Sequence, residues 1–287
     1  MDKGDAVTKD VIRYSILDPA GNITALADSP VPVGKQPEIA AELMSRHPEV
    51  EQVGFVRFSD SPDDPIRAEL RMAGGEFCGN ASVCAAALYL LEKEPEQDEC
   101  PVNIRLRVSG ASLPVDVSLR REEGNSFSAC IGLPSAKSIR SEELSFGTVS
   151  DTLPVVRMEG ISHIIIRPDS DFFRLQKDRT AVEEALRTWC GLLSVDSLGL
   201  IFLEPDGPDF RMTPFVYVPG SGTFFRENSC ASGSAAAAMA LAAERGTPVS
   251  LMLHEPGGCL RAECDPLSRK TLLYVRTRLL SRNEMSI

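Results

Sequence analysis

Two cysteines stand in matching surroundings and could carry protons as a pair. Cys78 lies in GGEFCGNASVCAAALYLL and Cys230 in RENSCASGSAAAAMALAAE. Each follows a glutamate, Glu76 or Glu227, and each precedes small residues and a long apolar run. The first N–H groups of a helix have no internal partners and favour an anion. A thiol at that position is therefore predicted to have its pKa lowered to roughly 7–8, which suits acid–base chemistry.

Placing two such thiols across one cleft would allow a specific reaction. A carbon held between them could lose a proton to one sulfur and gain a proton from the other on the opposite face, which inverts a stereocentre. The helix N-termini would bind an α-carboxylate and stabilise the developing carbanion. The resting pair is predicted to hold one thiolate and one thiol, because two facing thiolates repel. This scheme needs no cofactor and no metal.

The elements that must position these thiols form a repeat. With Cys78 aligned on Cys230, Ser82 falls opposite Ser234, and each apolar run lacks a polar face for two turns. A helix that is apolar all round must be buried. The two units lie about 150 residues apart, which predicts a duplicated α+β fold. We expect two pseudo-symmetric domains, each a mostly antiparallel sheet wrapped round a central apolar helix.

Most other segments predict short strands, because they are rich in branched residues and often alternate. The chain's 287 residues suggest two domains. We predict a first domain at 1–132 plus the C-terminal strand at about 272–287, a second domain at 133–271, and an active site in the cleft between them. Outer helices are expected at 36–47 and 180–193, and strands at 11–18, 22–28, 53–59, 66–73, 102–110, 113–119, 155–168, 198–205 and 210–219.

The composition and charge of the chain exclude some classes of binding partner. A net charge of −11 argues against nucleic acid and against anionic membranes. The N-terminal stretch is charged and lacks the apolar core of a signal peptide, and no apolar run approaches a membrane span. These features predict a cytoplasmic protein that acts on a small molecule; a homodimer is left open. Cys259, Cys264 and His254 do not form a convincing zinc motif, so no metal is expected. Cys84, Cys100, Cys130 and Cys190 are predicted to pack as small hydrophobes, as free cysteines usually do.

The motifs resemble those of diaminopimelate epimerase and its relatives, the cofactor-independent amino-acid racemases. EFCGNASVC resembles the family's first cysteine motif and SCASGSAAA its second. PAGN (19–22) and GISH (160–163) resemble the family's Gly-Asn and Gly-Asn-Pro-His elements. The resemblance covers nearly the whole chain. It implies that Cys78 and Cys230 are the catalytic acid and base.

The resemblance also implies roles for residues around the cysteines. Asn22 would orient the substrate, and His163 would support the site, although a histidine in an apolar strand is commonly a core residue. Glu76 and Glu227 would be supporting residues as well. Backbone amides would bind the α-carboxylate, and they belong to Gly79, Asn80, Ala231, Ser232 and Gly233.

Departures from the epimerase pattern bear on the substrate. The family's Glu-Arg pair before the second cysteine is Ser221-Gly222 here, and its substrate-binding asparagine in Gly-Asn-Pro-His is Ile161. Glu69 stands nine residues before Cys78, where the family has another asparagine. The partners of a distal carboxylate are therefore missing, and Glu69, Ile161 and Ser221 are candidates for the pocket. Glu69 could equally be a solvated strand residue. An amino acid with a basic or polar side chain is predicted, and histidine comes first because relatives that supply D-histidine for opine metallophores share the Glu-Phe-Cys-Gly-Asn form.

Three alternatives remain open at this stage. The chain could be a diaminopimelate epimerase itself. It could be an isomerase of the phenazine-biosynthesis type, which uses a carboxylate, here Glu227, in place of paired thiols. It could also be a non-catalytic relative that only binds a ligand. No phosphate-binding loop and no Gly-x-Ser-x-Gly nucleophile motif occurs in the sequence.

Overall fold

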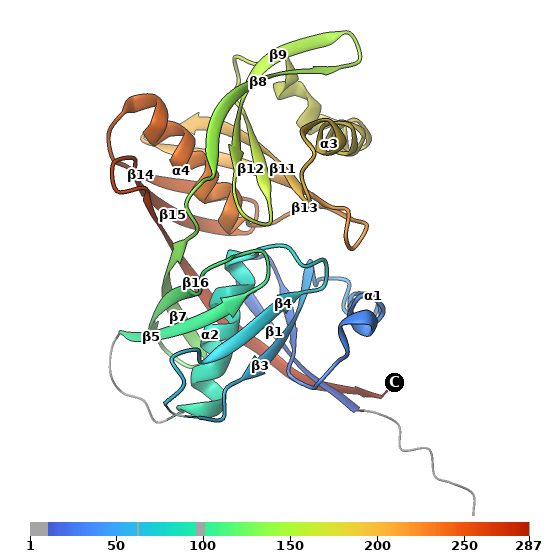
Figure 1. The fold of residues 1–287 in the computed structure, drawn as a ribbon, viewed down its shortest axis with the longest axis vertical. Helices are drawn as coiled ribbons and strands as arrows, with labels where there is room; N and C mark the ends of the chain where they lie inside the picture. Colours follow the sequence, from blue (N-terminus) through green and yellow to red (C-terminus); the bar gives the residue numbers. More distant parts are fainter. Residues whose placement is uncertain (1–10, 62, 96–100, 287) are drawn as a thin grey trace, which may run out of the picture.

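A computed structural model describes residues 11–61, 63–95 and 101–286. The residues form two lobes, one above the other in Figure 1, with α2 (Gly79–Lys93) inside one lobe and α4 (Ala231–Arg245) inside the other. The fold is of the mixed α+β kind, as predicted. Cys100, for which buried packing was predicted, lies outside the described residues.

Strands make up most of the described chain, and all of them belong to one continuous sheet. Their bounds are β1 (Val11–Pro19), β2 (Thr24–Ala27), β3 (Gln52–Phe58), β4 (Ala68–Met72), β5 (Val102–Val108), β6 (Val115–Arg121), β7 (Ser126–Leu133), β8 (Ser138–Phe146), β9 (Val149–Arg157), β10 (Ser162–Ile166), β11 (Leu198–Asp206), β12 (Asp209–Val218), β13 (Thr223–Arg226), β14 (Val249–Glu255), β15 (Gly258–Asp265) and β16 (Lys270–Ser286).

The first lobe is a ring of strands around α2. The strand order runs from β1 through β7 to β16, and β16 also pairs with β1, which closes the ring. Alternate residues point inward, as period-two side chains must: in β5, Ile104, Leu106 and Val108 are buried in the core that surrounds α2. The helix needs no polar face because strands surround it, and its residues from Gly79 to Leu90 are buried.

The second lobe consists of strands packed around α4. The sheet continues from β16 through β15, β14, β12, β11, β10 and β9 to β8, and α4 contacts most of these strands. Antiparallel pairing predominates; the parallel pairs are β2–β3, β4–β5, β10–β11 and β12–β14. A helix connects each parallel pair, as parallel neighbours require. The outer connections are α1 (Gln36–Arg46) and α3 (Arg179–Leu193), which lie on the same side of the molecule in Figure 1.

The long strand β16 joins the two lobes. Its first part pairs with β15 and β7, and its second part pairs with β1. Strand β16 spans Lys270–Ser286, close to the C-terminal strand predicted at about 272–287. Sequence patterning did not pick out β7, β8, β13, β14 and β15. For β8 the reason is local: its sequence SIRSEELSF is largely polar, and its side chains are mostly exposed or half-buried.

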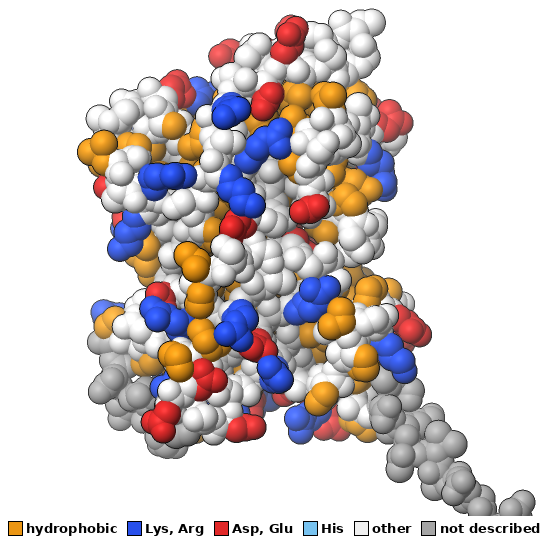
Figure 2. Space-filling view, in the orientation of Figure 1, with side chains coloured by type: hydrophobic (Ala, Val, Ile, Leu, Met, Phe, Trp, Pro, Cys, Tyr) orange, Lys and Arg blue, Asp and Glu red, His pale blue; other side chains and the backbone are white. Residues whose placement is uncertain are grey.

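On the face shown in Figure 2, basic and acidic side chains are interspersed, and no basic patch of the kind that binds nucleic acid stands out. Within the ranges that the structure describes, no helix combines the length and the apolar character needed to span a membrane.

Candidate active site

Cys78 is the N-cap residue of α2. Its sulfur accepts a hydrogen bond from the backbone N–H of Ala81 at 3.3 Å, and its carbonyl oxygen accepts from the hydroxyl of Ser82 at 2.7 Å. The thiol donates to Oε1 of Gln52 at 3.0 Å. The sulfur therefore faces the unpaired amides of the helix start, as the sequence predicted.

Cys230 is the N-cap residue of α4, in nearly the same conformation. Its sulfur accepts from the backbone N–H of Gly233 at 3.4 Å. A buried carboxylate lies behind it: Glu255 accepts from the N–H of Cys230 at 2.7 Å and from the hydroxyl of Ser234 at 2.6 Å. Glu255 thus binds part of the α4 N-terminus, where a negative charge is favoured.

The two helix N-termini abut. A Cβ atom built on Gly79 would lie 2.8 Å from the Cβ of Ala231, so only glycine fits at the first position of α2. Cys78 and Cys230 line one cavity of about 250 Å³. The cavity is shared with other residues that the sequence singled out, namely Glu76, Gly79, Ile161, Ser221, Glu227, Ala231 and Ser232.

Asn22 and Asn80 take a supporting position beside the cavity. Their side-chain amides both donate to the carbonyl oxygen of Ser229, at 2.5 Å and 3.0 Å. They thereby fix the segment immediately before Cys230 from the other lobe. Neither of these asparagines lines the cavity. Gly233, whose N–H donates to the sulfur of Cys230, does not line it either.

Of the two positions that the sequence left open for Glu69, the structure has the solvated one, since Glu69 does not line the cavity of Cys78 and Cys230. Glu69 lies on the outer face of β4, where Arg57 and Arg107 bind its carboxylate, and it lines a separate surface depression. Its neighbours Ala68 and Leu70 are buried. Because side chains alternate along a strand, Glu69 must point away from the core and from the cleft.

His163 supports the site through Ser232. The ring is fully buried, and its Nε2 lies 2.9 Å from the hydroxyl oxygen of Ser232. Burial lowers the pKa of His163 to about 3, so the imidazole is neutral at physiological pH. A Cβ atom on Gly199 would lie 2.3 Å from Nδ1 of His163, and this glycine therefore makes room for the ring.

The electrostatics of the cavity differ from the prediction. Burial raises the pKa of the Cys78 thiol, and Glu227 and Glu76 raise it further, although the Ala81 N–H opposes them. Burial also raises the pKa of Cys230, helped by Glu227 and Glu255. The expected lowering to roughly 7–8 is thus reversed, because desolvation and carboxylates outweigh the field of the helix terminus.

The carboxylates of the cavity respond to the same environment. Burial raises the pKa of Glu227 to about 8 and that of Glu51 to about 7. Glu51 accepts hydrogen bonds from the backbone N–H and the side-chain amide of Asn228. Burial raises the pKa of Glu76 as well. The cavity therefore holds several protons that a bound cation could displace.

Several site residues were missed by sequence reasoning. Glu51 and Gln52 reach the cavity from the start of β3, and α1 forms part of its wall with Ala40 and Met44. Glu255 reaches α4 from the tip of the β14–β15 hairpin. For Glu51 and Glu255, the sequence offered one signal, a charged residue next to apolar strand residues. The sequence alone does not say which element such a side chain contacts.

Solved structures with this fold include racemases and epimerases. A hydroxyproline epimerase from Agrobacterium vitis matches with a TM-score of 0.70 and 14% identity, over 98% of this chain and 94% of that one. A PhzF-family phenazine biosynthesis protein from Bacillus anthracis matches with a TM-score of 0.61 and 12% identity, over 97% of this chain and 100% of that one. At these identities the likeness describes the fold alone.

Sequence relatives define the class. The fold and the relatives are those of a cofactor-independent amino-acid racemase or epimerase, and the protein is an isomerase of this class. Residues 11–274 match the family described as the histidine racemase CntK N-terminal domain. The chain belongs to this CntK histidine racemase family. This assignment excludes the alternative, left open by the sequence, that the protein is a non-catalytic relative that only binds a ligand.

Two curated relatives show the extent of the likeness. A histidine racemase of Fusobacterium nucleatum subsp. nucleatum is 32% identical over 233 residues, which is 79% of this chain and 79% of the relative. A histidine racemase of Staphylococcus aureus is 26% identical over 256 residues, 88% of this chain and 89% of the relative. The match therefore extends across both lobes.

Proposed function

We propose that the protein interconverts L- and D-histidine by a two-base mechanism in which Cys78 and Cys230 act on opposite faces of Cα. One observation carries the proposal. The two sulfurs cap the N-termini of two helices that abut, and both line the same cavity. A carbon held between them is within reach of one base and one acid at the same time.

In this mechanism, one cysteine is a thiolate and removes the Cα proton. The other is a thiol and protonates the opposite face of the carbanion. The product leaves with the two protonation states exchanged, and proton transfer with solvent restores the starting state. Amide groups at the first turns of α2 and α4, including those of Gly79, Ala231 and Ser232, would bind the α-carboxylate and stabilise the carbanion.

The carboxylates of the cavity set the conditions for this chemistry. Carboxylates disfavour a thiolate, and an incoming α-ammonium group would favour it by the same Coulomb interaction. Glu227, with a pKa raised to about 8, would then be able to accept or release the proton that Cys230 exchanges. Substrate binding would thereby create the thiolate that catalysis needs.

The rest of the cavity supports a cationic or polar side chain. Glu51, Glu76 and Glu227 line it, and none of the described residues that line it is Lys or Arg. A second, distal carboxylate such as that of diaminopimelate would find no basic partner among these residues, whereas an imidazole would meet hydrogen-bond partners. Apolar residues, among them Met44, Phe77, Ile161 and Phe225, would contact the faces of the ring. The histidine racemases among the relatives point to the same substrate.

We further propose that the two lobes are domains related by duplication and a pseudo-twofold axis. The first would comprise 1–132 with the strand at about 272–287, and the second 133–271. The equivalent caps at Cys78 and Cys230 support this division, and so does the placement of a helix between each pair of parallel strands.

Hydrogen–deuterium exchange at Cα tests the proposal. The chain is incubated in heavy water with L-histidine, L,L-diaminopimelate and a panel of other L-amino acids, and deuterium incorporation is followed by NMR beside chiral chromatography. We expect exchange and racemisation of histidine to be the fastest in the panel. Fast exchange of diaminopimelate with none of histidine would reverse the substrate assignment.

A second candidate function rests on Glu227. Its carboxyl group lies in the cavity and has a pKa raised to about 8, which suits a general acid or base. An isomerase of the phenazine-biosynthesis type would use such a group alone. Comparing Glu227→Gln with Cys230→Ser separates the two functions, because the thiol is dispensable only if the carboxylate carries the reaction.

A further inference from the structure

A second polar cluster lies outside the active-site cavity, on the β14–β15 hairpin. Cys259 is exposed, and His254 stands directly opposite it in the register of the two strands. Side chains of residues paired across two strands lie on the same face of the sheet. Here Nδ1 of His254 lies 3.1 Å from the sulfur of Cys259.

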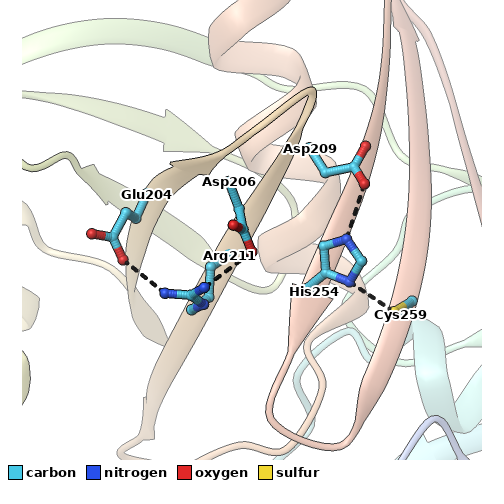
Figure 3. Close-up of polar contacts among 6 residues, drawn as sticks. All are labelled: Glu204, Asp206, Asp209, Arg211, His254 and Cys259. Carbon is cyan, nitrogen blue, oxygen red and sulfur yellow. Dashed lines mark hydrogen bonds and ion pairs between the residues drawn. The ribbon is translucent and has the colours of Figure 1, made fainter.

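Asp209, the first residue of β12, completes the cluster. Its Oδ2 lies 3.0 Å from Nε2 of His254, so the imidazole stands between the carboxylate and the thiol (Figure 3). Arg211, which is opposite His254 in the register, binds Glu204 and Asp206. In Figure 3 these ion pairs lie to one side of the contact between Asp209 and His254.

The order of the three groups defines a proton relay. A carboxylate facing Nε2 favours the tautomer with its proton on that nitrogen. Nδ1 then carries the lone pair and accepts the proton of the Cys259 thiol. This is the arrangement of a nucleophile, a base and a group that orients the base. The two ring nitrogens point in opposite directions, so the thiol and the carboxylate are not placed to share one metal ion.

The surroundings favour modification of the thiol over turnover of a bound substrate. Cys259, His254 and Asp209 line neither the active-site cavity nor any of four other depressions in the described part of the chain. The side chains of His254 and Asp209 are 41% and 34% exposed, so a small reagent reaches the cluster from solvent. Reactive cysteines occupy such exposed positions, whereas buried ones are inert.

We propose that Cys259 is a reactive thiol, activated by His254 and Asp209, that forms a mixed disulfide with low-molecular-weight disulfides such as oxidised glutathione. His254 takes the thiol proton, and the thiolate attacks one sulfur of the reagent. The new S–S bond forms as the S–S bond of the reagent breaks, and the departing thiolate takes the proton from His254. One thiol and one disulfide thus become one mixed disulfide and one thiol, with no net oxidation.

The experiment measures the modification rate of each cysteine separately in the full-length chain. The chain is treated with oxidised glutathione at neutral pH, quenched by alkylation, and analysed by peptide mass spectrometry. Cys130, half-buried and free, is the internal standard. The variants are His254→Gln, Asp209→Asn and, as the matched control, Arg211→Gln, which alters the same strand surface without touching the relay.

The expected result is that Cys259 reacts several-fold faster than Cys130. His254→Gln should slow it on the order of tenfold, less than an enclosed catalytic base contributes because this site is exposed. Asp209→Asn should slow it less, and Arg211→Gln should leave it unchanged. Equal rates in His254→Gln and the unaltered chain would show that exposure alone governs Cys259 and would overturn the proposal. Disulfide-linked pairs of chains without any mixed disulfide would overturn it too.

Discussion

The two cysteine caps have the same backbone geometry and different electrostatic surroundings. Cys78 is half-buried, and its thiol donates a hydrogen bond to the neutral side-chain amide of Gln52. Cys230 is buried and lies beside the carboxylates of Glu227 and Glu255. The two helix caps thus have different proton environments, although Glu227 raises the pKa of both thiols. The comparison teaches that the local sequence determines where the sulfurs lie, whereas Gln52 and Glu255, which come from distant strands, make the surroundings of the two sulfurs differ.

The strongest test of this comparison removes each thiol in turn. Cys78→Ser and Cys230→Ser are each expected to lower kcat for racemisation by about a thousandfold or more, because a hydroxyl cannot serve as the acid or base at neutral pH. Chiral chromatography of histidine incubated with each variant measures the loss. Cys130→Ser, which alters a half-buried thiol on β7, is the control and should retain full activity.

Solvent exchange sharpens the result. If the two thiols act on opposite faces, each serine variant keeps the base for one enantiomer only. One variant should exchange the Cα proton of L-histidine without inverting it, and the other should do so with D-histidine. Loss of exchange for the same enantiomer in both variants would contradict the assignment of the thiols to opposite faces.

A second test moves the caps apart. Gly79→Ala would place a methyl group 2.8 Å from the Cβ of Ala231 and 3.3 Å from Leu133. The helix N-termini must then shift, and displacement of a reacting group by about 1 Å can cost on the order of a hundredfold in rate. We expect kcat to fall by about ten- to a hundredfold, with a lower melting temperature.

The matched control for this change is Gly191→Ala. Gly191 lies in α3, and a Cβ there meets no atom within 4 Å. Alanine in a helix is more favourable than glycine by roughly 0.5–1 kcal/mol, so this variant should be slightly more stable and fully active. Full activity in Gly79→Ala would mean that the cleft tolerates a wider gap than the proposed mechanism requires.

A third test concerns Glu227, whose carboxylate raises the pKa of both thiols. The folded pKa of Glu227, about 8, lies above the ordinary value of 4.5, so the folded chain keeps a proton that the unfolded chain releases. The stability from this group is present below about pH 4.5 and is lost as the pH rises towards 8. Glu227→Gln should remove this slope, which chemical denaturation at several pH values would measure as on the order of 1–3 kcal/mol.

The same substitution should change the pH profile of catalysis. Without the charge of Glu227, both thiols ionise more readily, and the rise of kcat/KM with pH should begin on the order of one pH unit lower. Glu204→Gln, which alters a surface partner of Arg211, serves as the control for a lost carboxylate. An unchanged pH profile in Glu227→Gln would show that Glu227 does not affect the ionisation of the two thiols.

The parts of the site that sequence could predict are those with local causes. An apolar run after Gly-Asn or Ala-Ser predicts a buried helix, and the residue before it predicts the cap, so Cys78 and Cys230 could be placed without coordinates. Glu51 and Glu255 could not, because a strand register and a hairpin tip bring them to the site. Burial is the largest cause of the raised pKa values of both thiols, and burial is a tertiary effect that the local sequence does not state.

The position of Glu69 could have been decided from the sequence. Ala68, Leu70 and Met72 are buried in β4, and this alternation could be read in the sequence AELRM. A residue between such neighbours points to the opposite face of the sheet. The position of Glu69 relative to Cys78 suggested the substrate pocket, whereas its position in the strand indicates the outer face of the sheet.

The smallest expected effect therefore belongs to Glu69→Gln. Arg57 and Arg107 bind this carboxylate on the outer surface, and exposed ion pairs contribute only about 0–1 kcal/mol to stability. We expect kcat/KM for histidine to stay within about twofold, because this glutamate, unlike Glu227, bears on neither thiol, and the melting temperature to fall by a few degrees at most. Steady-state kinetics beside Glu227→Gln measures the contrast. A large change in KM for Glu69→Gln would return this residue to the substrate pocket and would mean that the cleft extends past β4.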